Sequence, residues 1–210
     1  MLWVVEKVHD FLIIPPMNKN KTGVVLLNMG GPSRLEDVRP FLFNIFSDRE
    51  IIRLGPPFLQ KVIAWFIARK RAPKSMATYE KIGGGSPIAA ITNAQERALE
   101  KSLENDGDFT VVTAMRYWRP STDDALLKLA QKKVDTIIGL SLYPHFSCAT
   151  SGSSLNELRR RIPKLYPAPL REIGSFQTHP LYLECLAEKI TEGLNTFADK
   201  EVEVLYSAHS

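Results

Sequence analysis

Five short apolar runs rich in β-branched residues are spread along the chain, and amphipathic helical stretches separate most of them. The runs, which we interpret as buried strands, are residues 24–28, 110–115, 136–142, 170–175 and 202–206. The helical stretches are residues 87–105, 121–133, 155–162 and 180–197. Because strands and helices alternate at this spacing, the sequence predicts an α/β fold with a parallel sheet and flanking helices.

Residues 29–109 interrupt this alternation, because they contain no good strand candidate. Ser33 and Glu36 have the spacing of a capping box, and apolar residues then recur at helical spacing up to Phe46. Pro40 lies within this helical pattern and predicts a kink or a break there. We therefore interpret this region as a helical insert between the first two strands.

The segment 58–71 within this insert is apolar nearly all round and ends in a basic cluster that Lys74 extends. One interpretation is a helix buried in the core. The other is an exposed apolar lip, whose neighbouring basic residues can meet anionic lipid headgroups. The sequence pattern alone leaves both interpretations open.

The composition is that of an ordinary globular protein, since 44% of the 210 residues are hydrophobic and 24% are charged. A formal charge of +4 is a weak field for this length, so we expect no nucleic-acid partner. Cys148 and Cys185 form no CxxC pair, which favours a reducing compartment and offers no self-contained metal site. No apolar run reaches the ~18–20 residues of a membrane span.

The first sixteen residues contain short apolar pieces that charged residues divide. We interpret them as a disordered leader, or as sequence upstream of a true start at Met17. A leader that touches a membrane is the alternative.

Residues able to do chemistry gather in the turns that follow the expected strands, where ligands bind in open α/β sheets. Three of the four histidines, His145, His179 and His209, fall in these turns. Imidazole can act there as a base or as a metal ligand, although a single histidine is more often a structural hydrogen-bonding group. These residues are compatible with a metal enzyme, a small-molecule binder or a hydrolase, and no GxSxG elbow supports the hydrolase.

Other residues in these turns have two interpretations each. Met29 is either a soft contact to a flat ligand or part of the core. Arg116 and Arg119 either anchor carboxylates or form salt bridges at helix ends. The triple glycine 83–85 either is a flexible turn before Ser86, which can cap the following helix, or allows the backbone to approach a ligand closely.

Five motifs, four in these turns and one in the insert, together resemble the ferrochelatase family, whose members insert ferrous iron into a porphyrin during haem biosynthesis. The motifs are LNMGGP at 27–32, IGGGSPI at 82–88, MRY at 115–117, YPHFSCATSGSSLN at 143–156 and SAHS at 207–210. The resemblance extends over residues 23–210. The GGGSPI and MRY motifs are closer to the protoporphyrin group of the family than to the coproporphyrin group.

The resemblance implies two similar Rossmann-like (chelatase-like) domains with porphyrin bound in the cleft between them. By this reading, residues 1–21 are a leader and residues 22–165 form the first domain. The first domain carries an apolar lip at about 36–74, and residues 166–210 begin a second, incomplete domain.

The resemblance also implies residue roles. His209 would be the active-site imidazole, which either accepts a pyrrole proton or ligates the iron. The other residues placed around the porphyrin are Met29, Ser86, Arg116, Tyr117 and His145. Met29 would lie over the opposite face of the ring, Arg116 would contact a propionate or assist the metal, and Ser86 would lie near the propionates.

The implied substrates are Fe²⁺ and protoporphyrin IX, and the implied location is cytoplasmic, peripheral on the inner face of the membrane. A homodimer is compatible with the family. The residues expected in the membrane lip are Phe41, Trp65, Phe66, Arg69, Lys70 and Arg71.

The sequence departs from the family pattern in one respect. The acidic residue that faces the histidine in the family would lie beyond Ser210, so we expect these residues alone to be inactive. Cys148 matches one ligand of the 2Fe–2S cluster of some members, but the other three ligands have no counterpart here, so no cluster is predicted. The alternative function is a non-catalytic module that binds a tetrapyrrole or a metal.

Overall fold

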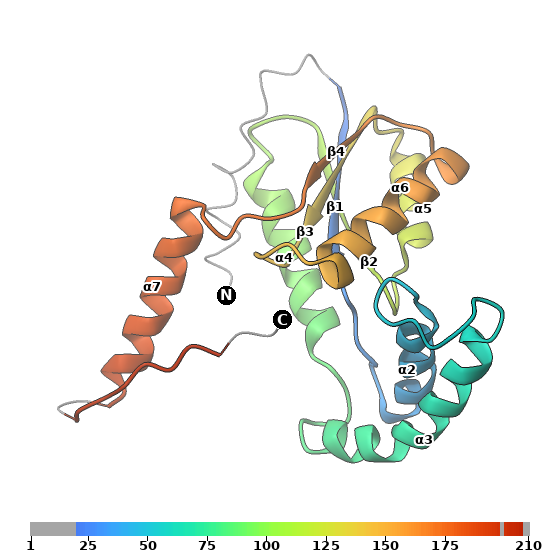
Figure 1. The fold of residues 1–210 in the computed structure, drawn as a ribbon. Coiled ribbons are helices and arrows are strands. Elements are labelled where there is room, and N and C mark those ends of the chain that lie inside the picture. Colours follow the sequence, from blue (N-terminus) through green and yellow to red (C-terminus); the bar gives the residue numbers. More distant parts are fainter. Residues whose placement is uncertain (1–19, 198–199, 208–210) are drawn as a thin grey trace.

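The structure is a computed structural model that describes residues 20–197 and 200–207. Its centre is a sheet of four parallel strands in the order β2-β1-β3-β4 (Figure 1). The strands are β1 (Thr22–Asn28), β2 (Phe109–Met115), β3 (Thr136–Ser141) and β4 (Leu170–Ile173). The predicted α/β class, the parallel sheet and the first four strands are therefore confirmed.

Both faces of the central strand β1 are buried, which explains why it is apolar along nearly its whole length, whereas the edge strand β4 carries the exposed Arg171 and Glu172. On one face, Val25 and Leu27 pack with residues of α5 (Thr122–Lys132) and α6 (Ser153–Leu165). On the other face, Val24 and Leu26 pack with Leu99 of α4 (Ile88–Ser102). Successive side chains of a strand point to opposite faces, so one short run supplies both cores.

The fifth predicted strand is wrong. Residues 201–207 have no regular secondary structure, and Leu205 and Tyr206 are 88% and 79% exposed. A β-branched run becomes a strand only where another strand pairs with it. Among the described residues, no strand pairs with this segment. Helix α7 (Pro180–Asn195), which precedes the segment, stands apart from the sheet in Figure 1.

Helices fill the long insert, as predicted, but their details differ from the expectation. A 3₁₀ turn (η2, Leu35–Asp37) leads into α2 (Val38–Ser47), and α3 (Gln60–Glu80) follows. Pro40 does not break α2, because it lies in the first turn, where the missing N–H has no intrahelical partner. The capping carboxylate belongs to Asp37 and not to Glu36. It accepts a hydrogen bond from the backbone N–H of Arg34 at 3.2 Å.

One side of helix α3 is buried and the other is exposed, so each interpretation of segment 58–71 holds for one side of the helix. Its small residues Ala64 and Ala68 are buried against Phe46 of α2 and form a third apolar core. Its large residues, among them Val62 and Phe66, are exposed. The helix is thus buried along one narrow stripe and apolar on its outer face. None of the helices in the described ranges is long and apolar enough to cross a bilayer.

The sheet continues past residue 165, where we expected the first domain to end. Strand β4 pairs with β3, with Leu170 opposite Ile137. A π-helical turn (η3, Cys148–Gly152) lies between β3 and α6. The point at which a second domain begins stays a prediction.

Candidate active site at the carboxyl edge of the sheet

The turns that follow β1 and β2 lie against each other through backbone hydrogen bonds. The N–H of Arg116 donates to the carbonyl of Asn28 at 2.8 Å, and the N–H of Tyr117 donates to that of Met29 at 3.0 Å. Parallel strands in register end at the same edge, so residues almost ninety positions apart become neighbours. The structure therefore brings together three of the predicted site residues, Met29, Arg116 and Tyr117.

The triple-glycine loop packs directly on the turn after β1. The Ser86 N–H donates to the Pro32 carbonyl at 2.8 Å. A Cβ atom on Gly85 would lie 2.3 Å from the Ser33 carbonyl oxygen, and one on Gly31 would lie 2.6 Å from the Ser86 Cβ. These two glycines are thus needed because the two loops touch: Gly85 faces the Ser33 backbone and Gly31 faces the Ser86 side chain. This contact also places Ser86 beside the Met29 turn.

The Ser86 hydroxyl forms a hydrogen bond at the start of α4, although the N-cap residue of that helix is Pro87. Its oxygen accepts the backbone N–H of Ile88 at 3.3 Å. Asn28, at the end of β1, is also fixed to α4, since its Nδ2 donates to the Thr92 hydroxyl at 3.1 Å. The edge of the site is therefore held by side chains that belong to the sheet and to α4.

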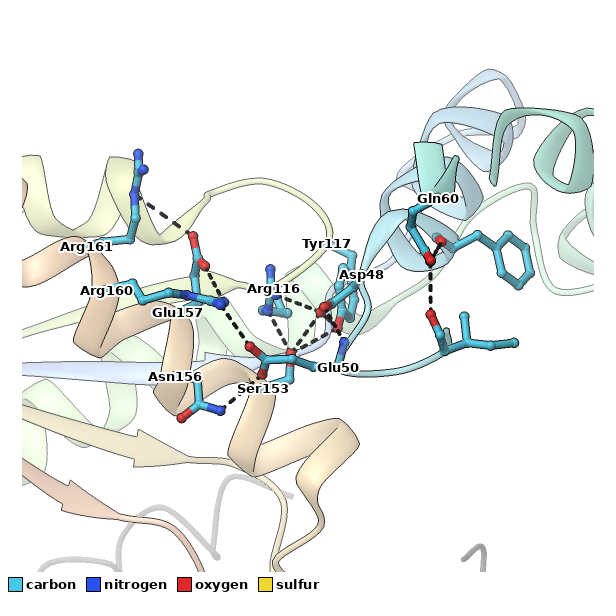
Figure 2. A network of polar contacts seen from close by, with 12 residues as sticks. Asp48, Glu50, Gln60, Arg116, Tyr117, Ser153, Asn156, Glu157, Arg160 and Arg161 are labelled. Carbon is cyan, nitrogen blue, oxygen red and sulfur yellow. Dashed lines mark hydrogen bonds and ion pairs between the residues drawn. The ribbon is translucent and has the colours of Figure 1, made fainter. Parts of the chain in front are cut away.

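A buried carboxylate that the sequence analysis missed lies next to the predicted arginine and tyrosine. Asp48 follows α2 directly, and its Oδ2 accepts hydrogen bonds from Arg116 Nη2 at 2.6 Å and from the Tyr117 hydroxyl at 2.7 Å (Figure 2). The Ser153 hydroxyl, at the start of α6, also donates to Oδ2, at 3.0 Å. Arg116 Nε donates in turn to the Ser153 oxygen at 2.9 Å.

This cluster fixes the charges of its members. Burial by itself raises the pKa of Asp48, but the Tyr117 and Glu50 hydrogen bonds and the Arg116 charge outweigh it, so the pKa lies below its usual 3.8. Burial and the hydrogen bond to Asp48 raise the pKa of Tyr117. At neutral pH the cluster therefore holds an ionised carboxylate, a charged guanidinium and a neutral phenol.

Tyr143 is a second residue at this edge to which the sequence analysis gave no role. It follows β3 by two positions. Burial raises its pKa to about 12, and a hydrogen bond with the Met29 backbone opposes part of that rise. A neutral phenol therefore lies against the predicted porphyrin-facing turn.

The predicted histidines do not all join this edge. His145 is exposed on the loop after β3, and no hydrogen bond or ion pair joins its side chain to another residue in the described parts of the chain. His209, with the rest of the SAHS motif except Ser207, lies outside the described residues. No three His, Cys, Asp or Glu side chains are grouped as metal ligands among the described residues.

The residues expected in a membrane lip divide into two sets. Phe41 is only 5% exposed and meets Trp118 edge-to-face at 6.2 Å between ring centroids, so its assignment to an exposed lip is wrong. Trp65, Phe66, Arg69, Lys70 and Arg71 are all exposed. The guanidinium groups of Arg39 and Arg69 lie 5.3 Å and 5.6 Å from the Trp65 ring, which is within cation–π range.

The structure thus defines an α/β protein whose candidate ligand site lies beyond the carboxyl ends of parallel strands. Residues 21–210 match the family model described as Ferrochelatase. The chain is 55% identical over 195 residues to a ferrochelatase of Desulfotalea psychrophila. It is 53% identical over 192 residues to one of Geotalea daltonii and 47% identical over 194 residues to one of Gloeothece citriformis.

The chain therefore belongs to the ferrochelatase family. These alignments cover 92%, 90% and 90% of the chain, in the same order. The chain spans 61%, 60% and 50% of the three relatives' own lengths.

Proposed function

We propose that this protein inserts Fe²⁺ into protoporphyrin IX, as a chelatase of haem biosynthesis. The observation that carries the proposal is the meeting of the LNMGGP, GGGSPI and MRY motifs at one edge of the sheet. Segments separated by tens of residues form a single surface there, bound together by the contacts of Asn28, Pro32 and Ser86. Family membership supplies the reaction class.

Metallation requires the porphyrin to lose two N–H protons while Fe²⁺ sheds water. A rigid pocket that favours a ring bent out of plane presents the nitrogen lone pairs and lowers the barrier. We propose His209 as the group that takes a pyrrole proton or ligates the incoming iron. A neutral imidazole with an ordinary pKa of about 6.5 suits both tasks.

The chain's other site residues have positioning roles in this proposal. Met29 faces the macrocycle from the β1 turn, and Ser86 lies near the propionates. Arg116 Nε donates a hydrogen bond to Ser153, and Arg116 Nη2 donates one to Asp48. A guanidinium has five N–H groups, so those that remain can meet a propionate while the internal contacts hold the plane of the group.

The test is metal insertion by protein expressed from the complete reading frame, followed as the loss of protoporphyrin fluorescence with Fe²⁺ or Zn²⁺. We expect His209→Ala to lower the rate by at least about 100-fold, which is typical when a proton-transfer group is removed. The matched control is His9→Ala, because His9 is the one histidine that follows none of the expected strands. Absence of metalloporphyrin above background, or full activity of His209→Ala, contradicts the proposal.

We further propose that the outer face of α3 rests on an anionic membrane. Phe66 is 62% exposed beside Trp65, which its ring meets at 5.0 Å between centroids, and Arg69 and Lys70 follow on the same helix. Phe58, in the turn before the helix, is 78% exposed. Aromatic side chains enter the interfacial layer, and lysine or arginine adds about 1 kcal/mol each near anionic lipid. Contact at the lip is compatible with peripheral attachment on the cytoplasmic side.

Vesicle flotation tests the membrane contact. We expect Arg69→Glu combined with Lys70→Glu to lower the fraction bound to phosphatidylserine vesicles by at least about tenfold, because two attractions become repulsions. The control is Lys132→Glu combined with Lys133→Glu, at the end of α5, where the same change in net charge lies away from α3. Equal flotation of both double variants refutes contact through α3.

A further inference from the structure

Helices α2 and α3 form a unit with a core of its own, which we call the hairpin (residues 38–80). Its buried centre is Phe46, Ala64 and Ala68, and this centre is separate from the two apolar cores of the sheet. In Figure 1 the hairpin lies at the end of the sheet where β1 ends. The hairpin is thus not fastened to the sheet by a continuous apolar core.

The loop that joins the two helices is tied to the hairpin by one buried glutamine. Gln60 is 2% exposed, and its Nε2 donates to the carbonyls of Phe46 at 2.8 Å and Ile52 at 2.9 Å. Its Oε1 accepts from the Leu54 N–H at 3.0 Å and from Arg49 at 3.2 Å. The loop that begins at Asp48 therefore moves with the hairpin.

Besides the ring contact of Phe41 with Trp118, polar contacts attach the hairpin to the sheet, and they converge on Asp48. Its side chain is 9% exposed, and it accepts from Arg116 and Tyr117 at the end of β2 and from Ser153 of α6 (Figure 2). Asp48 Oδ1 accepts the backbone N–H of Glu50 at 2.9 Å, which orients the carboxylate. One carboxylate thus joins the hairpin, β2 and α6.

Three further contacts support this attachment. Glu50 accepts from Asn156 at 3.1 Å and pairs with Arg160 at 2.9 Å, both on α6. Asn44 of α2 donates to the Tyr117 carbonyl at 2.9 Å. Glu50 and Asn156 are partly buried and Arg160 is half exposed, so the contacts around Asp48 are the most enclosed of the set.

We propose that Asp48 is a positioning residue that holds the hairpin against the carboxyl edge of the sheet and sets its distance from Arg116 and Tyr117. Because a buried, fully hydrogen-bonded charge pair has one good geometry, it fixes a position that apolar contacts alone would leave adjustable. Its consequence for porphyrin rests on the proposed function, in which Arg116, held by Asp48, meets a propionate.

Hydrogen exchange of the unliganded protein tests the attachment directly. Asp48→Asn keeps the shape of the side chain and removes its charge. We expect the exchange of the α2 and α3 amides to be accelerated at least about tenfold more than that of the β1 and β3 amides, which report global stability, because the hairpin opens as a local unit. Equal acceleration of helices and strands would show only lost global stability and would overturn the proposal, as would unchanged exchange in α2 and α3.

Two further variants make this test specific. Ser153→Ala keeps the Asp48–Arg116 pair but removes one donor to Asp48 and the acceptor of Arg116 Nε, so the same pattern is expected with a smaller acceleration, of about threefold. If Asp48→Asn does not fold, Ser153→Ala decides the test by the same criteria. Asp123→Asn removes a carboxylate that pairs with Arg161 between α5 and α6. It is expected to leave the exchange of α2 and α3 at wild-type rates, and acceleration there would overturn the proposal.

Porphyrin binding is a second test of the role of Asp48. We expect the Kd of Asp48→Asn for protoporphyrin IX to rise by about tenfold, and that of Asp123→Asn to stay at the wild-type value. An unchanged Kd together with faster hairpin exchange would refute the role of Asp48 in porphyrin binding. If the wild-type protein binds no porphyrin, the proposed function fails, whereas the exchange result still decides the attachment.

Discussion

Gly85→Ala is expected to lower the free energy of unfolding by about 3 kcal/mol, since a methyl group is forced into a packed contact. The added Cβ would lie 2.3 Å from the carbonyl oxygen of Ser33 and 2.8 Å from its carbonyl carbon. Both are backbone atoms, so no side-chain rotation relieves the clash. Separation of the two loops would break the 2.8 Å hydrogen bond from Ser86 to Pro32. Urea denaturation followed by circular dichroism measures the loss.

The control for this prediction is Gly193→Ala in α7. No atom lies within 4 Å of a Cβ built there, and alanine is favoured over glycine within a helix by roughly 0.5–1 kcal/mol. We expect Gly193→Ala to be neutral or slightly stabilising. Equal stabilities of Gly85→Ala and the wild-type protein would show that the two loops do not pack as described.

Arg116→Met is expected to destabilise the protein by about 3–5 kcal/mol, the range measured when one partner of a buried ion pair is removed. The side chains of Arg116 and Asp48 are 14% and 9% exposed, and Nη2 and Oδ2 are 2.6 Å apart. Methionine fills a similar volume but leaves the Asp48 carboxylate without a cation in a poorly solvated place. Urea denaturation again measures the change.

Arg119→Met is the matched control, three residues along the same turn. Arg119 pairs with Asp124 at 3.0 Å, but its side chain is 78% exposed, so the expected loss is about 0–1 kcal/mol. Combining Arg116→Met with Asp48→Asn should restore part of the loss, since neither buried charge then remains. Losses of similar size for Arg116→Met and Arg119→Met would refute the buried pair.

The strands and helices of the sheet could be predicted because each is a local pattern. Residues 24–28 are apolar on both faces, and 121–133 opens with a cap and an acidic first turn, as the structure confirms. Residues 202–206 have a similar composition and form no strand, because a strand also needs a partner. The sequence pattern left open whether segment 58–71 is buried or exposed, and it missed the buried position of Phe41, because that position depends on Trp118, which is distant in the sequence.

The candidate site likewise contains residues that the sequence predicted and one that it did not. Met29, Arg116 and Tyr117 were found because they lie in short motifs at the ends of predicted strands, and the register of β1 and β2 brings them together. Ser86 was found in the glycine-rich motif before a predicted helix. Asp48 was missed because it lies in an ordinary helix-to-loop segment and no local pattern distinguishes it. The nearest sequence signal was a lone acidic residue directly after an apolar helix.

The sequence by itself determined the α/β class, the order of the first four strands along the chain and the family. These properties follow from apolar periodicity and from motifs a few residues long. Only the tertiary structure decided that Gly85 and Gly31 serve the contact of two loops, and that Arg116 is bound to an internal carboxylate. The physical reason is that close packing and ion pairing depend on distances between residues up to about a hundred positions apart, such as Asp48 and Ser153, and no periodicity along the chain encodes them.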